Sequence, residues 1–239
     1  MATEEAGTLK SLILKVPVLR DVARAVYFTA SSALKPFRGS EDYWKRRYEA
    51  GRSSGAGSYN ELAEFKAEIL NGFVAKHGIE SVIEYGCGDG NQLELLRFAG
   101  YLGFDVSPEA VGLCRDLFAG DETKRFELTA DHACETARLT LSLDVVYHLV
   151  EDEVFDSYMR RLFDSSTEYV IVYSSNTNEQ ARIQPAHVRH RRFTDWVAEF
   201  RPDWALIEHV PNRYPFAGDE TSGSLADFYV FRKSAQRKS

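Results

Sequence analysis

The 239-residue chain is poor in cysteine, and this excludes two kinds of stabilised fold. Its three cysteines, Cys87, Cys114 and Cys134, have neither the number nor the spacing of a disulfide framework or a structural zinc site. We therefore expect a protein of a reducing compartment and predict a cytoplasmic location. We predict no metal site, because the His and Asp residues show no tight ligand spacing.

The chain also lacks an excess of basic residues and an uninterrupted apolar run. A formal net charge of −7 argues against a broad surface for DNA or RNA, so we expect no nucleic-acid partner. The apolar segment 9–34 contains five charged residues and Pro17, which excludes a comfortable membrane span. We interpret it as a helix packed on the core or on a partner subunit. The alternative is a helix lying on a membrane surface, which would make the protein membrane-peripheral.

What the sequence does contain is a regular alternation of apolar runs and helical patterns from residue 80 onward. Strands are predicted at 81–86, 101–106, 125–130, 139–145, 168–175, 204–210 and 226–233. Helices are predicted at 91–98, from 107 to about 120, at 151–164 and at 192–200. The last two strands have no helix between them, which favours an antiparallel hairpin at the sheet edge. The pattern predicts an α/β fold, a doubly wound, seven-stranded, mostly parallel sheet with an antiparallel last strand.

One predicted helix has clear end signals. Ser107 suits its N-cap and Pro108 its first turn, while Gly120 suits its end. Leu113 and Leu117, together with Cys114 and Phe118, are expected to form its buried side.

The front of the chain is patterned differently. Residues 1–75 read as helical and show no strand pattern, with a Gly/Ser loop at 52–58. We predict that 1–75 form an N-terminal helical cap or lid segment and that 76–239 form the ligand-binding domain.

A glycine loop follows the first predicted strand. It has the sequence EYGCGDG at 84–90 and stands where an open sheet binds its ligand. The glycines permit a tight turn and a close backbone approach to a ligand. A dinucleotide fingerprint would need its third glycine at position 91, which is Asn91, and no Gly-Lys-Ser/Thr follows as in a P-loop.

With Asp105, Asp131 and Asp144 in order behind this loop, residues 80–239 resemble the class I methyltransferases that use S-adenosylmethionine (SAM). The resemblance implies a Rossmann-like fold, SAM as cofactor and S-adenosylhomocysteine (SAH) as product. It implies that Asp105 binds the ribose hydroxyls, that Asp131 lies near the adenine amino group and that Asp144 lies by the transferred methyl. The cofactor-binding residues that it implies are Glu84, Gly86, Cys87, Gly88, Gly90, Asp105, Val106, Asp131, His132 and Leu143.

The front segment has two interpretations under this resemblance. Tyr43, Trp44 and Tyr48 are either core aromatics or part of a lid over SAM. As a lid, the segment would bind the cofactor through Tyr43 and Arg47, and Arg47, or Ser58 with Tyr59, would reach the methionine carboxylate.

Candidate catalytic groups lie after the fourth and fifth strands. His148 is the first choice of base, because its pKa is naturally near neutrality and it follows Asp144 by four residues. The alternative is that His148 only caps the next helix. His187 and His190 are further candidates for the base, and Asp144 is included in the predicted catalytic set.

Arg189, Arg191 and Arg192 concentrate positive charge beside these histidines, so we predict that they bind an anionic part of the substrate. The alternative is a solvated surface loop.

The sequence therefore predicts a SAM-dependent methyltransferase. It resembles bacterial enzymes of glycan or small-molecule methylation, which favours O-methylation of a sugar, glycan or other small acceptor, including anionic ones. Two alternatives stay open. One is an N-methyltransferase of an amino sugar or metabolite, and the other is a SAM-binding regulatory subunit without turnover.

Overall fold

The computed structural model describes residues 36–182, 184–218 and 222–234. The predicted helix at 9–34 lies outside the described residues. Seven strands form one sheet in the order β3-β2-β1-β4-β5-β7-β6. The strands are β1 Val82–Tyr85, β2 Tyr101–Asp105, β3 Lys124–Leu128, β4 Ala137–Leu143, β5 Ser166–Ser174, β6 Trp204–Val210 and β7 Asp227–Lys233.

Strands β1 to β5 are parallel, and β7 is antiparallel to both of its neighbours, β5 and β6. The predicted α/β class, the mostly parallel sheet and the antiparallel final hairpin are therefore confirmed. The chain reverses its winding direction between β1 and β4, which lie side by side. Ligands of such sheets bind at this switch point, beyond the carboxyl ends of the strands.

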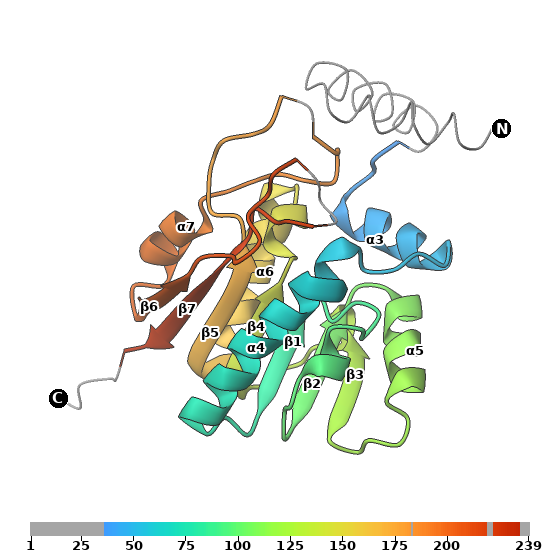
Figure 1. Cartoon of the computed structure of the whole chain (residues 1–239), viewed down its shortest axis with the longest axis vertical. Coiled ribbons are helices and arrows are strands. Elements are labelled where there is room, and N and C mark those ends of the chain that lie inside the picture. The colour runs from blue at the N-terminus through green and yellow to red at the C-terminus, as the bar shows by residue number, and fades with distance from the viewer. Residues whose placement is uncertain (1–35, 183, 219–221, 235–239) are drawn as a thin grey trace.

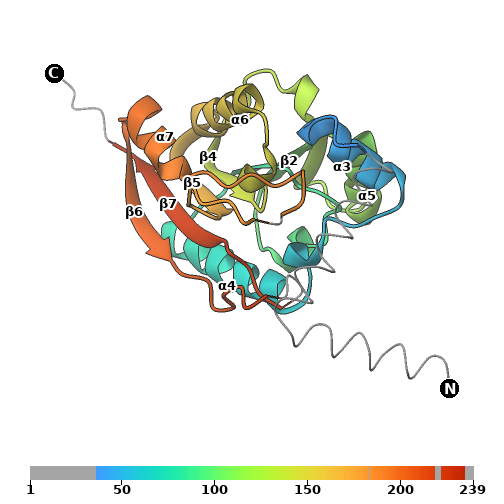
Figure 2. The ribbon, with the colours of Figure 1, turned by 90° about the horizontal axis from the view of Figure 1, so that it is seen from above.

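Helices cover both faces of the sheet (Figures 1 and 2). They are α3 Ser40–Glu49, α4 Asn60–His77, α5 Pro108–Leu117, α6 Asp152–Asp164 and α7 Phe193–Phe200. Side chains of α4 and α5 join one apolar core, and those of α6 and α7 join a second core on the other face. In β1, Val82 belongs to the first core and Ile83 to the second, as expected because successive strand residues face opposite sides.

One predicted helix is only a short turn in the structure. Residues 91–98 form a 3₁₀ turn, Leu93–Leu95, because the side chain of Asn71 on α4 bonds both the oxygen of Leu95 and the amide of Arg97. In α5 the capping prediction is confirmed, since Ser107 Oγ accepts from the Ala110 amide at 3.3 Å.

The buried face of α5 was predicted wrongly in part. Ala110, Val111 and Cys114 are buried, while Leu113 and Leu117 are exposed. The helix ends at Leu117, three residues before Gly120. Its buried face therefore holds fewer residues than the apolar pattern suggests.

The described part of the front segment is helical, in α3 and α4, as predicted. Helix α4 runs without interruption across residue 75, and the division of the chain there stays a prediction. No described helix is both long enough and apolar enough to cross a membrane.

Candidate functional site

The glycine loop leaves β1 in a left-handed backbone. Gly86, Gly88 and Gly90 have φ angles of 90°, 60° and 82°, a region that favours glycine. A Cβ atom at Gly86 would lie 2.5 Å from Val145 Cγ2, so the turn has no room for a side chain. The amides of Gly86 and Cys87 donate to the oxygen of Phe104 at 2.7 and 3.0 Å, which ties the loop to β2.

Asp105 is buried at the carboxyl end of β2, with the half-buried Val106 beside it. One carboxylate oxygen accepts from the Gly88 amide at 3.0 Å and the other from the Ser107 amide at 2.9 Å. Burial raises the pKa of Asp105 to about 6, although these amides favour the ionised form. Each oxygen keeps a lone pair for a further donor.

Glu84 and Cys87 contact the sheet and α5. The carboxylate of Glu84 accepts from the hydroxyl of Tyr101 at 2.6 Å, and burial raises the pKa of Glu84 to about 7. The adjacent thiol of Cys114 and burial raise the pKa of Cys87, and Cys114 Sγ donates to the oxygen of Gly88 at 3.2 Å. Glu84 therefore ties the end of β1 to Tyr101 of β2.

Residues 50–59, called here the covering segment, lie against the glycine loop. Their contacts meet at Asp89, whose Oδ2 accepts from the Ser54 amide and the Tyr59 hydroxyl, both at 2.8 Å. The Asp89 amide donates back to Ser54 Oγ at 3.0 Å. Arg47 Nε donates to the Ser53 oxygen at 2.6 Å. The predicted contact of Arg47 and Tyr59 with the methionine carboxylate is untested, and both side chains bond to protein groups here.

Asp144 stands at the end of β4 and is paired with a lysine that the sequence analysis missed. Its Oδ2 lies 2.6 Å from Lys66 Nζ, and its Oδ1 accepts from the Tyr147 hydroxyl at 2.8 Å. The Lys66 side chain is 1% exposed and that of Asp144 14%. Lys66 lies four residues from both Leu62 and Leu70 on the buried side of α4, and this was the signal available.

Three histidines lie close together beyond β4 and β5. His148 Nδ1 is 3.0 Å from the oxygen of His187, and His190 Nδ1 is 2.7 Å from Ser175 Oγ. The ring of His187 stacks on Tyr43 of α3 at 4.0 Å. Burial lowers the pKa of His148 to about 4 and of His187 to about 3, and it also lowers that of His190. All three rings are therefore neutral at pH 7.

The alternative role of His148 as a helix cap is wrong. The N-cap of α6 is Glu151, and the Nδ1 atom of His148 lies on the carbonyl of His187.

A cavity of about 590 Å³ brings together much of the predicted site. Its lining comes from α3, the covering segment, the end of β4 and the loops after β5 and β6. The predicted residues among its lining are Tyr43, Arg47, Asp144, His148, His187 and His190. The glycine loop and Asp105 are not part of the lining, whereas Ser54 and Gly57 of the covering segment are. Gly57 approaches Asp144 so closely that a Cβ there would lie 2.8 Å from Oδ2.

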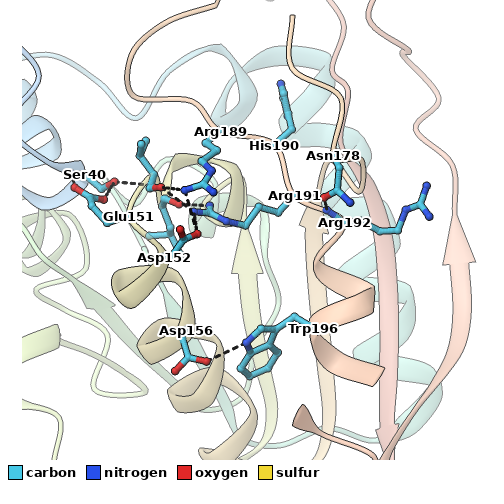
Figure 3. A network of polar contacts seen from close by, with 12 residues as sticks. Ser40, Glu151, Asp152, Asp156, Asn178, Arg189, His190, Arg191, Arg192 and Trp196 are labelled. Carbon is cyan, nitrogen blue, oxygen red and sulfur yellow. Dashed lines mark hydrogen bonds and ion pairs between the residues drawn. The ribbon is translucent and has the colours of Figure 1, made fainter. Parts of the chain in front are cut away.

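The arginines after β5, Arg189, Arg191 and Arg192, line a second cavity, of about 800 Å³. Figure 3 shows Arg189 and Arg191 turned toward Asp152 of α6, and Arg192 turned away from them. Both paired guanidinium groups lie 3.0 Å from the Asp152 carboxylate and donate to the oxygen of Val150. Arg191 also lies over the ring of Phe155. Arg189 and Arg191 therefore fasten this loop to the start of α6. That the three arginines bind an anionic part of the substrate stays a prediction.

Asp131, His132 and Leu143 complete the predicted set. Asp131 is exposed in a short turn after β3, and Leu143 is buried at the end of β4. His132 Nε2 lies 3.2 Å from Ser165 Oγ, and its ring packs edge-on against Tyr85 and Phe104. Within the described ranges no three His, Cys, Asp or Glu side chains are grouped so as to hold a metal ion.

No family model and no curated protein matches the sequence, whereas many solved structures match the fold. The N-methyltransferase NodS from Bradyrhizobium japonicum, in complex with SAH, matches with a TM-score of 0.64 and 15% identity over 82% of this chain and 98% of that one. Magnesium protoporphyrin IX methyltransferase from Synechocystis, with bound SAM, gives 0.54 and 15% over 90% and 97%. A SAM-dependent methyltransferase from Clostridium acetobutylicum gives 0.53 and 11% over 74% and 94%. The chain has the fold of these methyltransferases, as the resemblance predicted.

Proposed function

We propose that this protein is a SAM-dependent methyltransferase that methylates a hydroxyl oxygen of a small or glycan-type acceptor. The observation that carries the proposal is the left-handed glycine loop bound to a buried carboxylate, Gly88 to Asp105, in a sheet with the fold of SAM-dependent methyltransferases. The loop and the carboxylate lie at the switch point where sheets of this kind bind their ligands.

The residues at this point fit the chemistry of SAM. The Asp105 carboxylate has free lone pairs for the two ribose hydroxyls, and the glycine backbone allows close approach. Gln92, two residues past Gly90, has a buried Oε1 atom with no partner among the described residues. An α-ammonium group is the kind of donor that such an oxygen needs.

SAM supplies a methyl group bonded to a sulfonium. Bound SAM would supply this methyl group to the acceptor oxygen and leave as SAH, and the hydroxyl proton would pass to a base. The Nδ1 atom of His148 faces a carbonyl, which only accepts, so this nitrogen carries the ring hydrogen. The lone pair is then on Nε2 in a ring that lines the cavity. His148 is therefore our candidate for the base on geometry, and its pKa of about 4 makes it a weaker base than the near-neutral value expected from the sequence. The remaining lining residues orient the acceptor and exclude water.

Calorimetric titration with SAH tests the cofactor. We expect binding, and we expect Asp105→Asn to weaken it about tenfold, because the variant loses the charged acceptor for the ribose hydroxyls. Asp116→Asn, an exposed change on α5, serves as the matched control. No SAH binding by the unaltered protein would contradict the proposal.

A methyl-transfer assay with sugars, sugar phosphates and amines then tests turnover. SAH release with hydroxyl acceptors supports the proposal. SAH binding without release from any acceptor would instead favour a regulatory subunit.

A further inference from the structure

The Lys66–Asp144 pair decides the charge at the end of the cavity where methyl transfer is proposed. Lys66 comes from α4 and reaches Asp144 from the buried side of the sheet. An unpaired aspartate at this position would attract a cation from the cavity. Here one oxygen is held by the Lys66 ammonium and the other by the Tyr147 hydroxyl.

The other charges of the cavity have the opposite sign. Among the described residues that line it, Asp144 is the only acid, and the bases are Arg47, Arg52 and Arg182. With the acid neutralised by Lys66, the lining carries net positive charge although the chain as a whole is acidic.

The tryptophan of the cavity is already in contact with a cation, and the two stacked histidines are held neutral. A cation could bind over the face of Trp44, but the guanidinium of Arg47 already lies 5.5 Å from the centre of that ring. Burial keeps His148 and His187 neutral, since it penalises a positive charge on either ring at neutral pH.

We propose that the Lys66–Asp144 pair makes the acceptor site selective for hydroxyl groups, neutral or on an anionic molecule, and closes it to ammonium groups. The inference rests on the proposed function, because it assumes that this cavity receives the acceptor. Most alkylamines enter a site as ammonium ions at pH 7, and the sulfonium of SAM adds a second cation. An ammonium group there would need an unpaired carboxylate. Asp144 does not offer one, because its carboxylate is paired with Lys66. Lys66 is therefore a residue that sets specificity by holding Asp144.

Two ligands of equal size and different charge test the proposal, benzyl alcohol and benzylammonium, measured by ligand-observed NMR at pH 7. The unaltered protein should bind benzyl alcohol at least tenfold more tightly. In Lys66→Met this preference should shift by tenfold or more toward benzylammonium, because Asp144 then carries an unpaired charge. Lys76→Met, an exposed change on the same helix, should leave the preference unchanged.

A second variant keeps the test decisive if Lys66→Met fails to fold, since breaking a buried pair is costly. Asp144→Asn leaves the Lys66 ammonium without its carboxylate, so benzylammonium should bind even more weakly than to the unaltered protein. Equal binding of the two ligands by the unaltered protein, or a preference that neither variant changes, would overturn the proposal.

The binding measurements are made with and without SAH, which separates the two proposals. Failure of SAH to bind counts against methyl transfer. The charge preference of the cavity without SAH counts for or against the role of Lys66.

Discussion

The Nδ1 atom of His148 lies 3.0 Å from the main-chain oxygen of His187, so the loop after β5 fixes the ring of the histidine that follows β4. His187 in turn stacks on Tyr43 of α3. Three segments far apart in the sequence therefore hold one imidazole in one orientation and one tautomer. The following predictions concern the groups that surround this arrangement.

The buried histidines should make the protein less stable in mild acid. Burial lowers the pKa of His148 from 6.5 to about 4 in the folded chain. Below pH 6.5 the unfolded chain binds a proton that the folded chain does not, so the stability present above pH 6.5 is lost as the pH falls toward 4. We expect the unfolding free energy of His148→Gln to fall less steeply over this range than that of the unaltered protein.

Urea unfolding between pH 7 and pH 4.5 measures this slope. His209→Gln is the control, because His209 is a more exposed histidine on β6. Identical slopes for His148→Gln and the unaltered protein would contradict the prediction.

Glu84 should make the protein less stable as the pH rises. Burial raises the pKa of Glu84 from 4.5 to about 7. Below pH 4.5 the carboxyl is protonated in the folded and the unfolded chain, so it does not lower the unfolding free energy. The unfolding free energy falls as the pH rises from 4.5 through 7. Gln at this position keeps an oxygen for the Tyr101 hydroxyl but cannot ionise. The gap between the two pKa values corresponds to about 3 kcal/mol, by which Glu84→Gln should gain stability at pH 8 relative to pH 4.5.

Chemical denaturation at the two pH values checks the prediction for Glu84. A variant whose stability differs from that of the unaltered protein by the same amount at both pH values would show that folding does not shift the pKa of Glu84. Tyr101→Phe is the companion variant, and it should be less stable than the unaltered protein because Glu84 loses its donor.

The two neighbouring arginines after β5 should behave differently. Arg191 bonds the oxygens of Leu149 and Val150 and pairs with Asp152, so Arg191→Ala should cost about 1–3 kcal/mol of stability. Arg192 is exposed and points away from this network, so Arg192→Ala should cost less than about 0.5 kcal/mol (Figure 3). Thermal unfolding measures both, and equal losses would show that the network is not a stabilising one.

The covering segment should loosen when Asp89 is removed. Asp89→Ala deletes the two bonds that its carboxylate accepts from the covering segment, from the Ser54 amide and the Tyr59 hydroxyl, and a third from the Asn91 amide. We expect faster amide hydrogen exchange at Ser54, by about tenfold or more, because each lost bond contributes about 1 kcal/mol to closure. Asp116→Ala on α5 is the control and should not change this rate. Unchanged exchange in Asp89→Ala would mean that other contacts hold the segment.

Local patterns in the sequence predicted the sheet and the glycine loop, because strands, turns and caps depend on near neighbours. Strand β1, the turn at Gly86 and the cap at Ser107 are examples. The pairing of Lys66 with Asp144 joins positions 78 residues apart and depends on how α4 crosses the sheet, which periodicity does not specify. The pairing of Arg191 with Asp152, 39 residues away, could not be predicted for the same reason. The roles predicted for the cofactor residues stay predictions.

The three hydrogen bonds between Ser54, Tyr59 and Asp89 hold the covering segment against the glycine loop. If each contributes about 1 kcal/mol, opening costs about 3 kcal/mol, and less than about 1% of molecules are open at any moment. A ligand that enters only the open form then binds about a hundredfold more weakly than its contacts alone would allow. If the glycine loop binds SAM, as proposed, release of the product would depend on the same opening of the covering segment.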